Sequence, residues 1–371
     1  MASTDHKKPN PAQTRLQEGQ YEVTVPTVAD RIAQTVAAAR LEEAVEPVFH
    51  PDSYGYRPGR SQLDAAGACR ERCWEYTWVI DLDIRKFFDS VRWDLIVKAV
   101  EAHTSHETRW VVLYVKRWLA AALQLPDGTL QERDRGTPQG SAISPVLANL
   151  FMHYAFDLWL GREFPLVKFE RYADDAVIHC VGEHQARKVL AALHERMAEV
   201  GLELHPDKTK IVYCKDSNRC GSHEHTSFTF LGFTYRPRQA RRKDGRQFTS
   251  FLPAISKDAL KKISAEVRSW RLHRWVTSDG PEIARFINPK IRGWMTYYGA
   301  FYRSALYPLF RRINIYLLRW SMKKYKKYKK LRSWRKAIRA MAEAAGNRPR
   351  YFAHWAWVKP ARQRTRTTRA V

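Results

Sequence analysis

The alternation of apolar and polar residues predicts strands and helices together in the first two thirds of the chain. Residues 78–83 alternate strictly, which places Trp78, Ile80 and Leu82 on one face of a strand and two aspartates on the other. In residues 167–178, apolar residues flank the tetrapeptide YADD on both sides, which predicts two short strands joined by a tight turn. Apolar residues recur at helical spacing in five further segments: residues 27–45, 63–74, 108–123, 146–160 and 185–200.

The pattern changes near Ser256, where continuous helical periodicity begins. Leu260, Ile263 and Val267 then lie on one helical face, and Ser256 is a suitable N-cap. This change separates a mixed α+β domain from an all-helical one. We therefore expect four segments: a disordered stretch at residues 1–20, a mixed domain at 21–255, a helical domain at 256–345 and a basic tail at 346–371.

The composition adds a large excess of positive charge. The 371 residues include 64 Lys and Arg against 38 Asp and Glu, which gives a formal net charge of +26. Such an excess points to a polyanionic partner, either nucleic acid or an anionic membrane surface. The chain has no apolar run long enough to span a membrane, and no signal peptide opens it. We therefore expect a nucleic-acid-binding protein of the cytoplasm, associated with the nucleoid if it is bacterial, without a membrane partner.

Lysines and tyrosines interleave in the segment 323–330. A run of charge is often only a solvated helix face, but interleaved aromatic residues also suit contact with bases and phosphates. Together with the net charge, this arrangement favours an RNA-binding track. Its predicted members are six lysines: Lys323, Lys324, Lys326, Lys327, Lys329 and Lys330.

Aspartates on the predicted strands and turn are spaced in a way that suits metal binding. Asp174 and Asp175 lie at the predicted hairpin tip, where a solvated turn is the alternative to a metal site. Burying adjacent carboxylates without partners costs several kcal/mol, and a divalent cation is a common way to hold them. Asp81 and Asp83 share the accessible face of the strand, and spacing alone does not choose between them. Carboxylates on a strand beside such a turn are what two-metal phosphoryl transfer requires.

Five short blocks follow one another along the chain: residues 83–89 (DIRKFFD), 136–141 (GTPQGS), 172–175 (YADD), 201–209 (GLELHPDKT) and 230–233 (FLGF). Their order resembles that of reverse transcriptases, and the blocks are most similar to those of bacterial group II intron reverse transcriptase/maturases. The resemblance covers roughly residues 21 to 357. Residues 287–298 (INPKIRGWMTYY) resemble the maturase-specific thumb of that family, which separates it from retroviral-type enzymes.

The resemblance implies a right-hand polymerase fold. Fingers and palm, with a small antiparallel sheet, would form from residues 21–255, and a helical thumb or maturase-specific domain from residues 256–345. Two departures from the family are visible. Residues 17–22 are not basic where family members usually carry a basic, Gly-rich hairpin of the fingers, and no Cys/His-rich endonuclease domain follows residues 352–357. We therefore expect shortened fingers and no cleavage of a target by this chain.

The resemblance also assigns the catalytic residues. Asp83, Asp174 and Asp175 match the catalytic metal ligands of the family, which favours Asp83 over Asp81. The main-chain oxygen of Ile84 is a natural further ligand. The implied cofactor is a pair of Mg²⁺ ions, with Mn²⁺ as an alternative.

Further residues of the matching blocks are implied to contact the incoming nucleotide. Phe88 would pack under the sugar and exclude a 2′-hydroxyl, with simple core packing as the alternative reading. Gln139 would approach the sugar or the template strand. Lys208 would balance triphosphate charge, and Arg85 and Arg57 are further basic candidates, although Arg57 also fits an ordinary surface turn.

The predicted function follows from these assignments. We expect an RNA-directed DNA polymerase of a group II intron, with intron RNA as template, a DNA primer or target, and dNTPs as substrates. A maturase role in binding and splicing the intron RNA accompanies it. Two alternatives stay open: a truncated, polymerase-impaired copy that acts only as an RNA-binding splicing factor, and a reverse transcriptase recruited to a defence or diversity-generating system.

Overall fold

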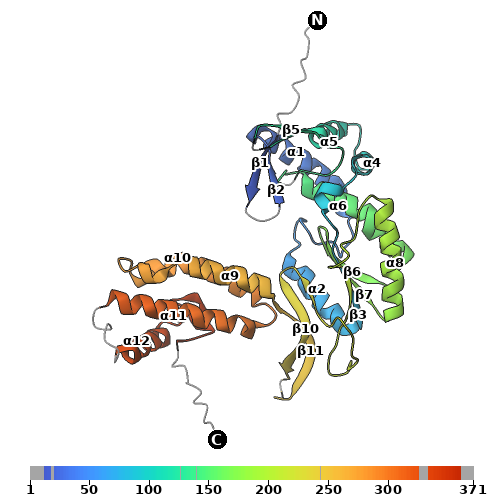
Figure 1. Cartoon of the computed structure of the whole chain (residues 1–371). Helices are drawn as coiled ribbons and strands as arrows, with labels where there is room; N and C mark the ends of the chain where they lie inside the picture. Colours follow the sequence, from blue (N-terminus) through green and yellow to red (C-terminus); the bar gives the residue numbers. More distant parts are fainter. Residues whose placement is uncertain are drawn as a thin grey trace. The chain divides into compact units, whose positions relative to one another are not determined.

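The computed structural model describes the chain in six stretches: residues 12–17, 21–125, 127–138, 140–242, 244–325 and 333–360. The chain forms two compact units (Figure 1). The first contains Met1–Phe230 and Arg236–Phe251, and the second contains Leu231–Tyr235 and Leu252–Val371. The long final segment of the second unit thus starts close to Ser256, where the helical periodicity begins.

Four strands form the central sheet of the first unit, in the order β6 (Lys168–Tyr172), β7 (Asp175–Cys180), β3 (Trp78–Leu82) and β8 (Lys210–Tyr213). All neighbouring strands of this sheet run antiparallel. β3 is an inner strand, because β7 and β8 use both of its hydrogen-bonding edges. The sheet and its surrounding helices confirm the predicted α+β class.

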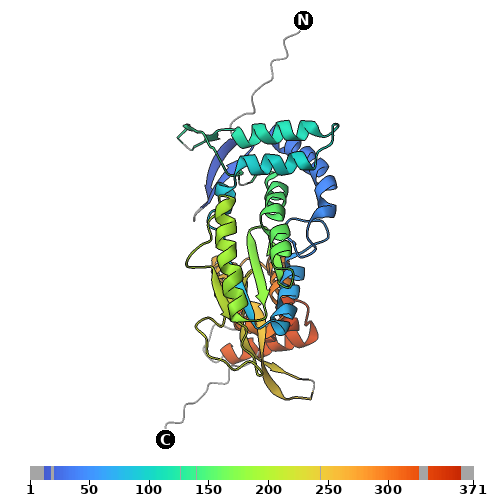
Figure 2. The same cartoon turned by 90° about the vertical axis from the view of Figure 1, so that its right-hand side faces the viewer.

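Helices cover one face of this sheet (Figure 2). α8 (Glu183–Glu199) runs along β3, β7 and β8, and α6 (Ser144–Met152) packs into the same hydrophobic core. Ile80, Leu82 and Ile178 belong to this core and are fully buried. Because side chains alternate along a strand, the intervening residues of β3 and β7 face the other side of the sheet.

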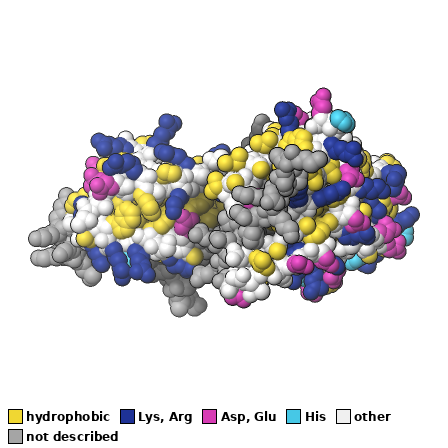
Figure 3. Space-filling view, turned by 90° about the horizontal axis from the view of Figure 1, so that it is seen from above, with side chains coloured by type: hydrophobic (Ala, Val, Ile, Leu, Met, Phe, Trp, Pro, Cys, Tyr) yellow, Lys and Arg dark blue, Asp and Glu magenta, His cyan; other side chains and the backbone are white. Residues whose placement is uncertain are grey.

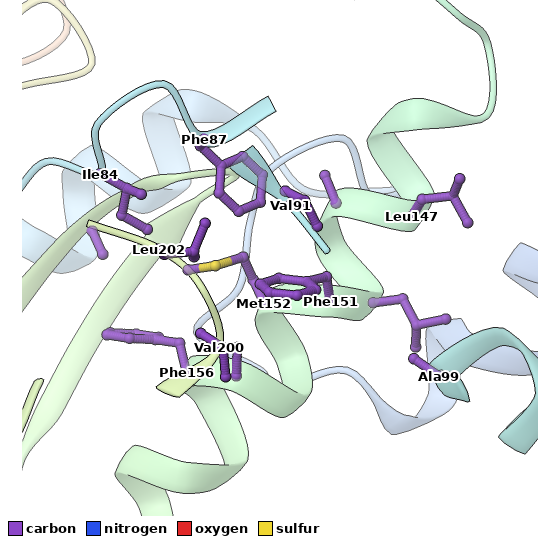
Figure 4. Close-up of a cluster of buried hydrophobic side chains, with 14 of the residues drawn as sticks. Ile84, Phe87, Val91, Ala99, Leu147, Phe151, Met152, Phe156, Val200 and Leu202 are labelled. Atoms are coloured by element: carbon purple, nitrogen blue, oxygen red, sulfur yellow. The ribbon is translucent and has the colours of Figure 1, made fainter. Parts of the chain in front are cut away.

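The core continues beneath the segment that follows β3 (Figure 4). Ile84 and Phe87 lie there with Met152 of α6 and with Leu202, which follows α8. Phe87 is the first residue of α3 (Phe87–Ser90), and all four side chains are buried. Packing of Ile84 and Phe87 into this core therefore holds the chain in place directly after Asp83.

α2 (Gln62–Glu75) packs against β6 and β7. Ser61 and Asp64 form a capping box at its start, with the Ser61 hydroxyl accepting from the Asp64 amide. Its side chains Cys69 and Cys73 are fully buried. Cys69 lies against Glu170 and His179, which alternate with core residues of β6 and β7 and so belong to the face opposite α8.

The other helices of the first unit gather beyond the sheet. They are α1 (Val28–Val45), α4 (Trp93–Ala102), α5 (Arg109–Ala120) and α7 (Leu158–Glu163). α1 begins where the sequence predicts, because the Thr27 hydroxyl accepts a hydrogen bond from the Asp30 amide. α6 and α7 are joined by a widened helical turn, His153–Asp157.

A second small sheet has the order β2 (Tyr21–Val25), β1 (Ala12–Gln17), β4 (Leu123–Gln124) and β5 (Leu130–Gln131). β1 and β2 pair antiparallel, which corrects two predictions. Residues 12–17 are not disordered, and a strand pair occupies the place where we expected the fingers hairpin to be missing. The prediction failed because pairing with β2 and β4 holds β1, whose sequence AQTRLQ shows no clear apolar alternation.

A three-stranded sheet, in the order β11 (Gln247–Ile255), β10 (Phe233–Arg241) and β9 (Phe228–Phe230), occupies the part of the chain that is divided between the units. The second unit is otherwise helical, with α9 (Lys257–Ser269), α10 (Gly280–Tyr298), α11 (Tyr307–Lys324) and α12 (Ser333–Asn347). Short helical turns elsewhere are Glu46–Val48, Leu272–Arg274, Arg303–Leu306 and Ala353–Ala356.

The helical unit extends beyond residue 345, where the sequence predicted a basic tail. Phe352, Trp355 and Val358 are buried in the same core as Ile287 and Phe310. Their aromatic and apolar side chains outweigh the basic residues around them, so residues 352–358 belong to the folded unit. The remainder of the predicted tail, residues 361–371, lies outside the described part of the chain.

Basic side chains are prominent on the surface. Figure 3 shows Lys and Arg side chains on the visible face of both units, as the net charge of +26 leads one to expect. None of the helices in the described stretches is both long enough and apolar enough to cross a membrane.

Candidate active site

The two strands β6 and β7 meet in a turn that carries the paired aspartates. Tyr172 and Asp175 are the last paired residues of the hairpin, so Ala173 and Asp174 alone form the turn. Ala173 has a φ of 59°, in the left-handed region that a non-glycine residue adopts only when its surroundings enforce it. Gly55 lies directly against the Ala173 backbone, and a Cβ at residue 55 would clash there.

The register of the sheet brings Asp83 to the same place. β3 and β7 pair up to Leu82 and Ala176. One further step in this register sets Asp83 opposite Asp175, and opposite residues in antiparallel strands have Cβ atoms about 4.5–5.5 Å apart. The next step sets Ile84 opposite Asp174. The three aspartates predicted from the sequence therefore lie at one end of the central sheet β6-β7-β3-β8, called the palm sheet below.

The main chain of Ile84 faces these aspartates. The main-chain oxygen of Asp83 accepts a hydrogen bond from the His205 amide at 2.8 Å. The Arg85 amide donates to the main-chain oxygen of Glu203 at 2.8 Å. Peptide groups alternate in direction along an extended chain, so those of Ile84 point the opposite way, toward the β7 side. Its carbonyl oxygen is thus available on the side where Asp174 lies.

Two lysines approach from β8 and from the segment that precedes it. Lys208 Nζ lies 3.4 Å from both carboxylate oxygens of Asp83, and Lys210 Nζ lies 3.6 Å from Asp81. Asp81 is more buried than Asp83, with 15% against 35% of the side chain exposed. Burial raises the pKa of Asp81 to about 7, although Lys210 opposes the shift. Asp83 is thus the more accessible carboxylate of the two, in line with the family pattern.

The paired aspartates have raised pKa values. Burial raises the pKa of Asp175 to about 8, and the charges of Asp81, Asp174 and Asp83 add to the shift, while Lys208 opposes it. Burial is also the main reason why the pKa of Asp174 is raised. A carboxylate with a raised pKa is one whose charge lacks sufficient neutralisation, and a divalent cation would supply it.

The aspartates are close but are not drawn into a tight cluster. In the described stretches, three metal-type ligand atoms lie within 4.8 Å of one another only at Cys69, Glu170 and His179. At the sheet end, the carboxylate oxygens of Asp83, Asp174 and Asp175 do not all lie within this distance of one another. Hard carboxylate oxygens and a main-chain oxygen are still the donors that Mg²⁺ and Mn²⁺ prefer, so the residues fit such an ion.

A buried arginine supports the turn from behind. The Arg171 guanidinium is fully buried and donates to both carboxylate oxygens of Asp157, at 2.7 and 2.6 Å. It also donates to the Ala173 carbonyl oxygen at 2.8 Å and to the Asn149 side-chain oxygen at 3.1 Å. The Asn149 amide in turn donates to the carbonyl oxygen of Gly55 at 2.6 Å. This network ties the turn to α6 and to the widened helical turn His153–Asp157, and sequence reasoning missed it.

A second charged network lies further along the sheet. Glu170 accepts from Arg72 at 2.6 Å and contacts His179 Nε2 at 2.6 Å, and Arg72 also donates to Asp52 at 2.8 Å. Burial alone would lower the pKa of His179, but the Glu170 charge and hydrogen bond raise it to about 10. Cys69 contributes in the same direction. These charges therefore neutralise one another inside the protein.

The loop around residues 136–137 lies against the segment after β3. The Thr137 amide donates to the Phe88 carbonyl oxygen, and the Gly136 amide donates to that of Val91, both at 2.7 Å. Gly136 has a φ of 82°, and a Cβ there would come within 2.8 Å of the Phe88 oxygen, so only glycine fits. The Phe88 side chain is half-buried beside the core. Gln139, the predicted sugar or template contact, lies outside the described residues.

The predicted basic contacts differ in their surroundings. The Arg57 side chain is 5% exposed, and its guanidinium donates to Glu46 and, at 2.7 Å each, to the carbonyl oxygens of His50 and Ser53. This guanidinium holds the loop together, which fits the alternative of a turn residue, and the contact of Arg57 with a triphosphate stays a prediction. Arg85 remains accessible, with 54% of its side chain exposed beside Glu203.

Only part of the predicted lysine track falls within the described residues. Lys323 is exposed at the end of α11. Lys324 donates to three carbonyl oxygens of residues 276–278, the shortest bond being 2.7 Å to Ser278. Lys324 thus stabilises a loop, which sets it apart from Lys323. The other four predicted members, Lys326, Lys327, Lys329 and Lys330, lie outside the described part.

Comparison with known families gives two matches along the chain. A family model described as reverse transcriptase (RNA-dependent DNA polymerase) matches residues 6–235. A second model, group II intron, maturase-specific domain, matches residues 260–339. The first match contains all of the aspartates described above.

Curated relatives are similar to parts of this chain. Protein YkfC of Escherichia coli (strain K12) is 29% identical over 254 residues, which cover 56% of this chain and 61% of the relative. Group II intron-encoded protein LtrA of Lactococcus lactis subsp. cremoris is 29% identical over 129 residues, 35% of this chain and 21% of the relative. The chain thus spans less than two thirds of the length of these relatives.

Among solved structures, the telomerase of Candida albicans, in a complex with a fragment of telomeric RNA, aligns with a TM-score of 0.52. The alignment covers 95% of this chain and 64% of that one, at 10% sequence identity. At this identity the likeness concerns the fold alone.

Proposed function

Because this chain belongs to the reverse transcriptase family and carries a group II intron maturase-specific domain, we propose that it is an RNA-directed DNA polymerase with a maturase role. It copies an RNA template into DNA from a DNA primer with dNTPs, and it binds intron RNA to assist splicing. The observation that carries the proposal is the meeting of Asp83, Asp174 and Asp175 at the end of the sheet, where burial and repulsion raise the pKa of the paired aspartates.

The carboxylates have a defined task in this proposal. Asp83, Asp174 and Asp175, with the main-chain oxygen of Ile84, hold two Mg²⁺ ions or, alternatively, Mn²⁺. When bound, such ions activate the primer hydroxyl and stabilise the leaving oxygen of the pyrophosphate. The raised pKa of Asp175 means that this residue must lose a proton before it can take its place as a ligand.

Neighbouring side chains orient the nucleotide in this scheme. Lys208 pairs with Asp83 at 3.4 Å, and 59% of its side chain is exposed, so it is free to exchange this partner for triphosphate oxygens. The Arg85 side chain is similarly exposed beside Glu203, and in this proposal it also contacts the triphosphate. Phe88 packs under the sugar in this scheme. The loop that contains Gly136 lies against the Phe88 carbonyl oxygen and holds the backbone of Phe88 in position.

Primer extension on an RNA template tests the polymerase directly. The full chain is incubated with primed RNA, dNTPs and Mg²⁺, beside an Asp174→Ala/Asp175→Ala variant as control. The wild type is expected to extend the primer, and the variant to be slower by about 1,000-fold or more. Equal extension by both proteins would overturn the assignment of the aspartates.

An RNA-binding role without polymerisation is the second candidate. It is favoured by one observation: the unit that contains the maturase-specific match has a hydrophobic core of its own, separate from the core beneath the sheet-end aspartates. Absence of extension by the wild type, with tight and salt-sensitive binding of intron RNA, would support this role over the polymerase.

A further inference from the structure

A cavity in the helical unit is lined by three arginines. It has a volume of about 460 Å³ and lies beside the C-terminal end of α10. Arg292 comes from α10, Arg303 from the turn that precedes α11, and Arg350 from the segment after α12. All three side chains are exposed, and no acidic residue lines the cavity. The cavity is therefore strongly positive.

The arginines are not neutralised by the protein. In the described stretches, none of the three forms an ion pair with a carboxylate, whereas Arg171 and Arg72 do so in the first unit. The C-terminus of a helix carries about half a negative charge, which one guanidinium would balance. Three guanidinium groups around one cavity exceed that need, so an anion from outside is the natural partner.

Part of the cavity wall, called its apolar floor below, is apolar. Met295, Ala353 and Trp357 line it. Gly299 lies so close to the Trp357 ring that a Cβ at residue 299 would clash with it, which holds the ring in place. Arg303 lies over this ring, 5.2 Å from its centroid. The cavity thus combines cationic groups with a flat aromatic and aliphatic surface.

We propose that this cavity binds one unpaired nucleotide of an RNA strand, an inference that rests on the RNA-binding role proposed above. The arginines bind the phosphate, since a guanidinium matches phosphate oxygens in two-point contacts. The apolar floor receives the base, as aromatic side chains do in single-strand recognition. A paired base is stacked inside its duplex and cannot enter, so the cavity selects a bulged or looped nucleotide.

Equilibrium binding of two RNA hairpins tests the proposal. One hairpin carries a single unpaired adenosine in its stem, and the other has a fully paired stem. Fluorescence anisotropy with the full chain is measured in EDTA without dNTPs, so that the result is independent of polymerisation. The wild type is expected to prefer the bulged hairpin by about tenfold, as the stacking of one base provides.

Two variants and one control locate this preference. Arg303→Gln/Arg350→Gln removes cationic groups, and Ala300→Trp fills the cavity without changing charge. Both are expected to reduce the preference to about onefold. Arg268→Gln removes a charge from an exposed position on α9 outside the cavity, and it should weaken both hairpins equally. Thermal melting of each variant checks that it is folded. If Arg303→Gln/Arg350→Gln does not fold, the binding preference of Ala300→Trp alone tests the proposal.

Three results would overturn the proposal. The first is a wild type that binds the bulged and the paired hairpin equally, and the second is a pair of cavity variants that keep the preference for the bulged hairpin. The third is loss of this preference when free AMP is added at the concentration of the RNA, which would assign the cavity to a free nucleotide. Primer extension by the wild type is scored separately. A chain that extends primers but shows no preference would contradict this inference and leave the proposed polymerase standing.

Discussion

The palm sheet carries two kinds of charged residues that differ in how they are neutralised. Behind the turn, Arg171 and Asp157 are completely buried and make paired contacts of 2.6–2.7 Å with each other. At the exposed end, Asp175 lies among other carboxylates, and its pKa is raised to about 8. Charges that stabilise the fold find partners within the chain, whereas the charges proposed for catalysis need a partner from outside.

Asp83 offers the largest expected effect. Asp83→Asn should reduce primer extension by about 1,000-fold or more, because one ligand of the proposed ions is lost. Its free energy of unfolding should stay equal or rise, since a repulsive charge is removed from beside Asp175. Extension assays and urea denaturation measure the two effects. A variant that loses stability and activity together would place Asp83 among the structural charges instead.

Arg171→Met tests the other kind of charge. Removing this partner leaves the Asp157 carboxylate buried and unpaired, which should lower the free energy of unfolding by about 3–5 kcal/mol. The matched control is Arg187→Met, which breaks an exposed pair with Glu183 and should cost about 0.5 kcal/mol or less. Urea denaturation of both variants gives the comparison. The distinction fails if the two substitutions cost the same.

The pH dependence of stability should further distinguish the sheet-end carboxylates from the internally paired charges. The pKa of Asp175 is raised in the folded chain from an ordinary value near 4 to about 8. The folded state then binds a proton more tightly than the unfolded state, so stability falls as the pH rises from about 4 to about 8. Urea denaturation in EDTA at several pH values should show this slope, with a smaller slope in Asp175→Asn. An identical slope in both proteins would contradict the assignment.

Phe88 and Phe87 give the same contrast for apolar side chains. Phe87 is 2% exposed within the core, so Phe87→Ala should cost about 3–5 kcal/mol of stability. Phe88 is half-buried and is proposed to contact the sugar, so Phe88→Ala should incorporate ribonucleotides more readily, by about tenfold or more. Single-nucleotide incorporation with dNTP and rNTP measures this change. Unchanged sugar selectivity would leave Phe88 as a packing residue.

The two lysines of the β8 side provide the smallest expected difference. Lys208→Gln should raise the KM for dNTPs about tenfold, because a charged contact with the triphosphate is lost. Lys210 is paired with the less accessible Asp81, so Lys210→Gln should leave the KM for dNTPs nearly unchanged. Steady-state extension over a range of dNTP concentrations measures both. Equal KM values in the two variants would remove the distinction.

The sequence predicted the aspartates of the candidate site because local patterns determine their positions. Strict alternation placed Asp83 just beyond β3, and apolar flanks placed Asp174 and Asp175 at a hairpin. The sheet register that brings them together follows from pairing of these predicted strands. The short-range pattern and the ordered blocks were therefore enough to predict where the aspartates of the site lie. The catalytic roles given to these aspartates remain proposals.

Other features depend on contacts that no local pattern reveals. An arginine in a polar loop has the same sequence signature whether it binds phosphate or Glu46, so the sequence alone did not show that Arg57 holds its own loop together. The Arg171–Asp157 pair joins a strand to a widened helical turn, and only the folded chain shows that both are buried. A charged residue within a strand, three residues before Asp174, was the one signal available for it.

The central claim is that the sheet-end carboxylates take their partner from outside the chain, and bound Mn²⁺ tests it most directly. Electron paramagnetic resonance counts the ions held by the full chain with primed RNA template. The wild type and Asp157→Asn should retain bound Mn²⁺, since Asp157 belongs to the internally paired charges. Asp174→Ala/Asp175→Ala should lose it. Equal amounts of bound Mn²⁺ in the wild type and the double variant would contradict the account.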